Sequence, residues 1–301
     1  MTMSDNIKGC ILMMLAMGTF VVNDAFMRQA LQELPLYQAI FLRGVCLTLV
    51  LVGLAWNRGV LRYRIRPVDR WRIYLRTTGE VVGTFLFLTA LSLMPFANIS
   101  AIMQVLPLSV ALGAVLFLGA SIGWKRMTAI LMGFAGVMII IRPGTNGFTP
   151  ASILVLLAVV AVTVRDLAAR VLSPDIPSLV VAVNATIVLT GVTAILTATQ
   201  PWQAVSVKSA ACLLAAGLCL TVGYITSVAA MRVGDITTVA PFRYTAMIWA
   251  LLIGIFAFGE TPDTWTFIGA AVIIGMGVFS FYRERQLQST ALSKQKDTPA
   301  A

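Results

Sequence analysis

The sequence predicts an all-α polytopic membrane protein with ten transmembrane helices, and both its composition and its apolar runs point to this class. Hydrophobic residues make up 59% of the 301 residues, charged residues only 11%, and the mean hydropathy is +0.90. Because soluble domains carry about 25% charged residues, this chain lacks the polar surface that a water-facing fold needs. Apolar runs of about 20 residues, the length that crosses a hydrocarbon core of about 30 Å, recur along the whole chain.

Five apolar runs precede residue 145, and each predicts one helix. They lie at residues 8–26, 37–56, 72–93, 97–118 and 126–142. The first run closes on an Asn-Asp pair and the third carries Glu80. The fourth contains Pro107, and the fifth ends in the glycine-rich stretch GFAGVMII.

Five further runs follow, at residues 150–169, 178–198, 209–231, 236–257 and 264–282. The sixth run ends in an Arg-Asp pair, and the tenth closes on a second glycine-rich stretch, IIGMGVFS. The ninth contains Pro241, which removes one backbone donor and is expected to kink its helix. Short connections make consecutive helices antiparallel, and the polar tail at residues 283–301 is predicted to be disordered.

The distribution of lysine and arginine predicts the orientation of these helices. If the N-terminus is cytoplasmic, 15 basic residues fall on the cytoplasmic side. Only Arg28, Arg142 and Lys208 fall on the opposite side. Since cytoplasmic loops carry the excess of basic residues, both termini are predicted to be cytoplasmic. The net charge of +10 is therefore explained by membrane topology, without a nucleic-acid partner.

The two sets of five helices echo each other. The spacing Asp-x3-Arg-x6-Pro that begins at Asp24 recurs from Asp166, 142 positions later. This divides the chain into two repeats, at residues 7–145 and 150–282, followed by the tail. An odd number of helices per repeat places the second repeat upside down relative to the first. Inverted five-helix repeats are typical of transporters whose substrate site lies near the membrane midplane.

Several of these features together resemble a known family. Ten spans in a five-plus-five repeat, the Asn-Asp pair, the stretch LPLYQAIFLRG and the Gly259-Glu260 pair resemble the drug/metabolite transporter superfamily, in its EamA-type branch. The resemblance covers roughly residues 7–282. The first repeat has Gly-Ala-Ser at residues 119–121 where the second has Gly259-Glu260, so no transport role is assigned to Glu260.

This resemblance implies a secondary transporter of the bacterial cytoplasmic membrane. The N-terminal stretch looks most like the riboflavin-uptake members of the branch, which makes riboflavin uptake the best guess. It is also similar to S-adenosylmethionine carriers, and export of amino acids or amines is a further alternative. The direction of transport stays open, because inverted repeats make both faces alike.

Polar residues inside the spans are the candidates for a substrate site, because ionisable groups are costly in a bilayer. Gln104 and Arg243 occupy matching places in the two repeats, and a guanidinium suits a carboxylate, a phosphate or an imide carbonyl. Glu80 either binds a cation, carries a coupling proton, or forms an ion pair with Arg76 or Arg243. Tyr224 and Tyr244 are added because a phenolic hydroxyl in a dry interior needs a partner.

A second group of polar residues lies at the ends of the first and sixth spans, and we expect it to form a gate or hinge. Its members are Asn23, Asp24, Arg28, Arg165, Asp166 and Arg170. In each repeat, the aspartate and the arginine four positions later are expected to form a local ion pair. Arg43, in the second span, either snorkels to the surface or pairs with Asp24.

The remaining function classes have little support in the sequence. No GxxxxGK[ST] loop is present, so this chain is not expected to hydrolyse ATP. An intramembrane enzyme would need a nucleophile with a base, paired carboxylates or a metal cluster. The chain has no histidine, and its four cysteines are scattered, so no metal site or cofactor is predicted. The expected partners are the bilayer, a small solute and protons, in a monomer or homodimer.

Overall fold

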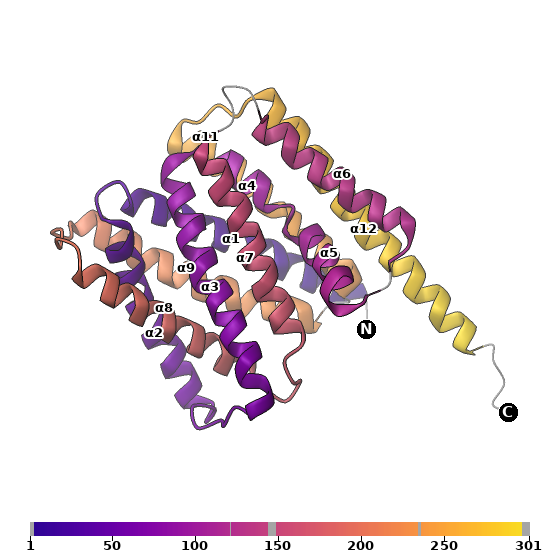
Figure 1. The fold of residues 1–301 in the computed structure, drawn as a ribbon, viewed down its shortest axis with the longest axis horizontal. Helices are drawn as coiled ribbons and strands as arrows, with labels where there is room; N and C mark the ends of the chain where they lie inside the picture. Colours follow the sequence, from indigo (N-terminus) through magenta and orange to yellow (C-terminus); the bar gives the residue numbers. More distant parts are fainter. Residues whose placement is uncertain (1–2, 121, 144–148, 234–235, 297–301) are drawn as a thin grey trace.

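The computed structural model describes residues 3–120, 122–143, 149–233 and 236–296, and the regular elements in these ranges are all helices (Figure 1). The first half contains α1 (Met3–Ala30), α2 (Leu36–Asn57), α3 (Pro67–Leu93), α4 (Phe96–Met103), α5 (Leu106–Leu118) and α6 (Trp124–Ile141). The second half contains α7 (Pro150–Arg170), α8 (Ser178–Ala198), α9 (Val207–Val233), α10 (Ile236–Val239), the 3₁₀ helix η1 (Ala240–Tyr244), α11 (Thr245–Phe258) and α12 (Thr264–Lys296).

The helices fit a protein that crosses a membrane many times. Within the described residues, nine helical segments are long and apolar enough to span a bilayer, which confirms the predicted polytopic all-α membrane class. The third predicted span lies in α3, which is not one of the nine. Its first half carries Asp69, Arg70, Arg72, Arg76 and Glu80, and these lower its hydropathy. One face of α3 packs extensively against α7, while its other face carries exposed apolar side chains such as Trp71, Tyr74 and Val82.

The fourth and ninth predicted spans are both interrupted within their first half. In the first half, α4 ends at Met103 and α5 begins at Leu106, with Pro107 in its first turn. In the second half, η1 separates α10 from α11 and has Pro241 near its start. Proline lacks an N–H and is tolerated in the first turn of a helical segment. The kink expected at Pro241 is therefore confirmed, as a break between helical segments.

Helices of one half pack mainly against helices of the other. α1 packs against α9 while α3 packs against α7, so the first helix of each half meets the third helix of the other. Figure 1 shows α6 beside α12 at one edge of the bundle and α2 beside α8 at the opposite edge. This reciprocal pairing is what two repeats related by a pseudo-twofold axis produce.

Glycine residues make close contacts at both the α3–α7 and the α1–α9 interfaces, and the contacts are related by the repeat. A Cβ atom on Gly83 of α3 would meet Val162 of α7 at 3.0 Å, and one on Gly223 of α9 would meet Phe20 of α1 at 2.7 Å. Phe20 and Val162 lie 142 positions apart, the offset at which the Asp24 spacing recurs. Small residues at these positions let the helix backbones approach closely, as in other membrane helix pairs.

Replacing Gly79 with leucine should separate α3 from α7. A Cβ atom there would meet the Ala161 carbonyl oxygen at 2.8 Å and the Arg165 backbone nitrogen at 3.0 Å, and neither backbone atom can rotate away. We expect the unfolding free energy to fall by about 1–3 kcal/mol, as for other overpacked sites. Thermal unfolding in detergent measures this. Gly53→Leu in α2 is the matched control, since nothing lies within 4 Å of its Cβ position; equal losses in both variants would contradict the packing argument.

The largest buried apolar cluster includes residues from α4, α6 and α12. Phe96, Ile102, Ile130 and Ile273 are all at most 1% exposed. α12 itself continues to Lys296, and Figure 1 shows its last turns projecting beyond the bundle. The sequence predicts disorder from residue 283, whereas the structure is helical as far as Lys296. The difference has a local cause, because residues 283–296 contain no glycine or proline and are rich in good helix formers.

Candidate functional site

A cavity of about 360 Å³ lies between the two halves of the bundle. Its walls come from the middle turns of α1, α3 and α9 together with parts of α2, α4, α5, α7, η1 and α11. The polar and charged residues that line it are Asn23, Asp24, Arg43, Glu80, Thr84, Ser100, Gln104, Arg165, Arg243 and Tyr244. A mostly apolar cavity of this size with a few converging polar groups is the usual form of a small-molecule site.

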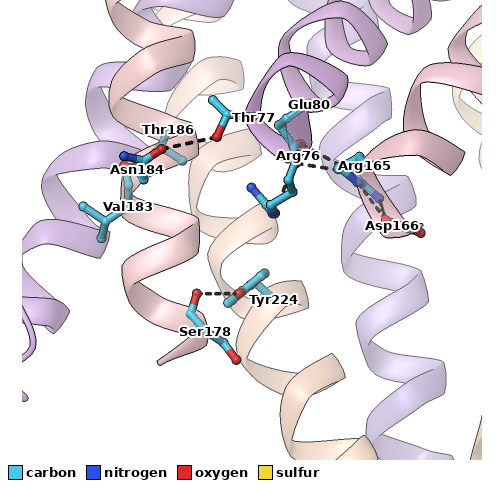
Figure 2. Close-up of polar contacts among 10 residues, drawn as sticks. All are labelled: Arg76, Thr77, Glu80, Arg165, Asp166, Ser178, Val183, Asn184, Thr186 and Tyr224. Carbon is cyan, nitrogen blue, oxygen red and sulfur yellow. Dashed lines mark hydrogen bonds and ion pairs between the residues drawn. The ribbon is translucent and has the colours of Figure 1, made fainter. Parts of the chain in front are cut away.

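Glu80 is held between two arginines (Figure 2). Its carboxylate lies 3.4 Å from the Arg76 guanidinium on the same helix and 3.4 Å from that of Arg165 on α7. Arg165 also forms an ion pair with Asp166 at 2.9 Å. Of the two ion-pair partners predicted for Glu80, Arg76 is therefore found and Arg243 is not. The second partner, Arg165, comes from the other half and ties α3 to α7.

Asn23, Asp24 and Arg43 form a second polar group in the cavity wall. The Asn23 side-chain amide donates to Asp24 Oδ1 at 2.9 Å, and the Arg43 guanidinium donates to Asn23 Oδ1 at 3.4 Å. Arg43 is only 7% exposed, so it does not snorkel to a surface. Arg43 is not among the substrate residues predicted from the sequence. An arginine within the apolar stretch AIFLRGVCL was the signal, because an intramembrane charge is a functional candidate by default.

Gln104 and Tyr244 join the two helix breaks. The Gln104 side-chain amide donates to the backbone carbonyl of Tyr244 at 2.9 Å, across 140 positions of sequence. The ring of Tyr244 packs edge-on against Phe281, and its hydroxyl is buried against Gly277 of α12. That hydroxyl has no hydrogen-bond partner among the described residues. Tyr244 thus lines the cavity, but its hydroxyl does not face into it. This differs from the expectation based on the sequence.

Arg243 differs from the other arginines of the cavity. Arg165 has acidic partners, and Arg43 is hydrogen bonded to Asn23, whereas Arg243 makes no ion pair with any described residue. Its side chain is exposed, and it belongs to the cavity lining. Arg243 is therefore the cationic group of the cavity that is open to a ligand.

Tyr224 lies apart from these residues. It is not in the cavity lining, and its hydroxyl donates to the Ser178 carbonyl at 3.3 Å, as Figure 2 shows. Its ring packs in a separate apolar cluster with Leu51 and Ala182 of α2 and α8. The structure thus groups four of the five predicted substrate residues around one cavity and places Tyr224 outside it.

The predicted local ion pair between Asp24 and Arg28 is wrong. Arg28 pairs instead with Glu260 at 2.6 Å, in the connection between α11 and α12, and its guanidinium lies 4.6 Å from the ring centre of Phe258. Asp24 turns to the cavity instead. One helical turn separates the two residues, but Arg28 pairs with a carboxylate in the connection between α11 and α12, and Asp24 accepts a hydrogen bond from Asn23.

The second predicted local pair, Asp166 with Arg170, is wrong as well. Asp166 is bound to its neighbour Arg165, and Arg170 is exposed at the end of α7. Residue 121, whose counterpart in the second half is near Glu260, lies outside the described residues. The gate or hinge role of these residues stays a prediction.

Glu260 also caps the N-terminus of α4, where Phe96 and Ala97 are buried. Its two carboxylate oxygens accept hydrogen bonds from the backbone N–H groups of Phe96 at 2.9 Å and Ala97 at 3.3 Å. These are orphan donors at the start of α4, where the helix dipole favours a negative charge. One carboxylate from the second half thus binds α1 through Arg28 and α4 through its backbone.

Replacing Glu260 with glutamine should destabilise the protein more than replacing Arg28 with glutamine. The first change leaves the Arg28 charge without its partner and weakens the cap of α4, whereas the second leaves the cap in place. We expect the unfolding free energy to fall by about 3 kcal/mol in Glu260→Gln, because breaking a buried ion pair costs about this much. Thermal unfolding of both variants and of the double variant measures the difference. Equal losses in the two single variants would show that the α4 cap contributes nothing.

Comparisons with known proteins agree with this geometry. The model of the EamA-like transporter family matches residues 7–142 and again residues 149–282. The chain is 24% identical to an S-adenosylmethionine uptake transporter of Rickettsia prowazekii, over 96% of this chain and 97% of that protein. It is 31% identical to a riboflavin transporter of Vibrio cholerae, over 68% of each chain.

Two further similarities bear on function and fold. The pseudopaline exporter CntI of Pseudomonas aeruginosa is 26% identical over 89% of this chain and 93% of its own length. A solved crystal structure superposes with a TM-score of 0.62 at 20% identity, over 95% of this chain and 99% of that chain. The relatives thus include both importers and exporters, and the solved structure shows that the fold is shared.

Proposed function

This chain belongs to the EamA-like transporter family, and we propose that it is a secondary transporter of a small metabolite that carries a carboxylate. S-adenosylmethionine is the first candidate. The two halves would rock about the cavity and expose it to each side of the membrane in turn. Consistent with this, the contacts that cross the cavity join one half to the other: Glu80 with Arg165, and Gln104 with Tyr244.

The observation that carries the proposal is that Arg243, in the cavity wall, makes no ion pair with any residue that the structure describes. The guanidinium is accessible at the cavity and has no acidic partner among the described residues, so a solute that enters the cavity can supply the anion. A carboxylate accepts two parallel N–H bonds from a guanidinium, which is the strongest geometry available to this side chain. The Gln104 carbonyl and the Ser100 hydroxyl line the same cavity and offer neutral polar contacts to the rest of the solute.

Riboflavin is the second candidate, and the Vibrio cholerae relative favours it. Arg243 and Gln104 could bind the imide carbonyls of a flavin, as the sequence analysis expects. Riboflavin has no carboxylate, however, and would leave the Arg243 charge uncompensated in the loaded cavity. S-adenosylmethionine has a carboxylate, and the Rickettsia prowazekii relative matches nearly the full length of this chain.

The purified protein in liposomes can decide between these solutes. Liposomes preloaded with unlabelled S-adenosylmethionine should accumulate the labelled compound by counterflow, whereas riboflavin-loaded liposomes should not accumulate labelled riboflavin. S-adenosylhomocysteine, which keeps the carboxylate, should compete, and 5′-methylthioadenosine, which lacks it, should compete poorly. Counterflow of riboflavin alone would overturn the proposal of a carboxylate-bearing solute. We place the protein in a bacterial cytoplasmic membrane with both termini inside, as the basic residues predict.

A further inference from the structure

Four carboxylates of the described chain lie at the cavity or at the helix ends around it, and they differ in their partners. Glu80 is paired with Arg76 and Arg165, Asp166 with Arg165, and Glu260 with Arg28. Asp24 is the exception, because none of the described basic groups lies within ion-pair distance of it. Its recorded hydrogen bond comes from the neutral amide of Asn23. An ion pair holds a carboxylate in its charged form, whereas a neutral amide bonds to either form.

The hydrogen bonding of Asp24 leaves room for a proton. Asn23 donates to Oδ1, and Oδ2 makes no hydrogen bond to a described residue, while the side chain as a whole lines the cavity. A proton on Oδ2 would therefore leave the Asn23 bond in place. Because Asp24 lines the cavity, a proton can reach it there without opening the interface between α1 and α9.

The charged groups around Asp24 come from several helices. On α2, Arg43 acts on Asp24 through space, because its own hydrogen bond goes to Asn23 and its Nε has no partner among the described residues. On α3, Glu80 is already bound by two arginines. On η1, Arg243 lines the same cavity, next to Tyr244 in the sequence. On α9, Tyr224 is bonded to Ser178, and α10 and α11 contain no ionisable residue.

We propose that Asp24 is the residue that binds the coupling proton, and that its protonation turns Arg43 into a second anchor for the carboxylate of the solute. With Asp24 ionised, its charge balances Arg43. Once a proton from the aqueous phase binds Oδ2, the solute carboxylate takes over that role and lies between Arg43 and Arg243. Both then cross together, and the proton leaves Asp24 with the solute on the other side. This inference rests on the proposed transport function.

The proposal makes proton and solute bind together. The carboxylate that the solute brings replaces the charge that the proton removes, so the charge balance around Arg43 is kept in the loaded state. A charge without a counter-charge would be costly to carry through a low-dielectric interior. This predicts symport of proton and solute. If proton binding displaced the solute instead, the protein would exchange protons for solute.

The test compares two aspartates at the same place in the two repeats. With the membrane potential clamped at zero, an inward gradient of one pH unit should drive about tenfold accumulation, since it is worth about 1.4 kcal/mol for one proton per solute. Asp24→Asn should lose this accumulation while solute counterflow continues. Asp166→Asn is the matched control, because Asp166 lies 142 positions later, is paired with Arg165 and is absent from the cavity lining. It should keep the pH-driven accumulation.

Other outcomes separate this inference from the proposed function. If Asp24→Asn still accumulates solute along the pH gradient, or if wild type shows counterflow with no response to pH, Asp24 is not the coupling residue. If no solute shows counterflow, the transport proposal fails, and the proton site is tested alone by infrared spectroscopy of the detergent-solubilised protein. A carboxylic acid carbonyl band that appears on acidification should be missing in Asp24→Asn and present in Asp166→Asn. The same band in both variants would overturn the assignment.

Discussion

Replacing Arg243 with glutamine should weaken the binding of carboxylate-bearing solutes by about 10- to 100-fold, since hydrogen bonds to a charged group are worth about 1.5–3 kcal/mol. Arg243 lines the cavity without an acidic partner among the described residues, so its loss leaves no other charge uncompensated. The binding of 5′-methylthioadenosine should change little. Competition against labelled S-adenosylmethionine in liposomes measures each affinity.

Two further variants sharpen this prediction. Arg243→Lys keeps the charge but loses the planar pair of donors, so it should restore only part of the affinity. Arg232→Gln removes an exposed arginine at the end of α9, outside the cavity lining, and should bind like wild type. If Arg243→Gln lowered the affinity for 5′-methylthioadenosine as much as for S-adenosylhomocysteine, Arg243 would hold the shape of the cavity and would not bind a carboxylate.

Replacing Glu80 with glutamine should strongly destabilise the folded protein. It removes one carboxylate from two guanidiniums, Arg76 and Arg165, and one Arg76 nitrogen already lacks a hydrogen-bond partner among the described residues. Breaking a buried pair costs about 3–5 kcal/mol, and partial exposure to the cavity places Glu80 at the lower end of that range. Thermal unfolding in detergent should show the loss.

A second substitution separates charge from packing. Adding Arg76→Gln to the Glu80→Gln variant removes the charge that has lost its partner, since Arg165 keeps its ion pair with Asp166. The double variant should therefore be more stable than Glu80→Gln alone. A double-mutant cycle then gives the coupling between the two residues. If the losses simply add, the ion pair has no stabilising role. The sequence also allows Glu80 to carry the coupling proton. Two arginine partners make that role less suitable for Glu80 than for Asp24.

Local sequence patterns predicted the positions of the apolar helices well. They predicted the ion pairs between side chains poorly. The spacing of Asp24 and Arg28 is the spacing of a helical ion pair, yet Arg28 binds Glu260. A pair one turn apart on a helix is worth only about 0.2–0.5 kcal/mol. The Glu260 carboxylate is also held in place by two backbone N–H bonds. Its ion pair with Arg28 is therefore more stable than the local pair, although the two residues lie far apart in the sequence.

The sequence by itself determined the membrane class, the positions of the apolar spans, the break at Pro241 and the family resemblance. These properties depend on residues that are neighbours along the chain, since hydropathy and proline act locally. Only the tertiary structure decided which charges meet: Glu80 with Arg165, and Arg28 with Glu260, each from opposite halves. It also decided that Arg43 lies inside the cavity and Tyr224 outside it. Such contacts depend on how helices rotate and pack against one another, and in a bilayer that is set by close packing and polar pairing between helices.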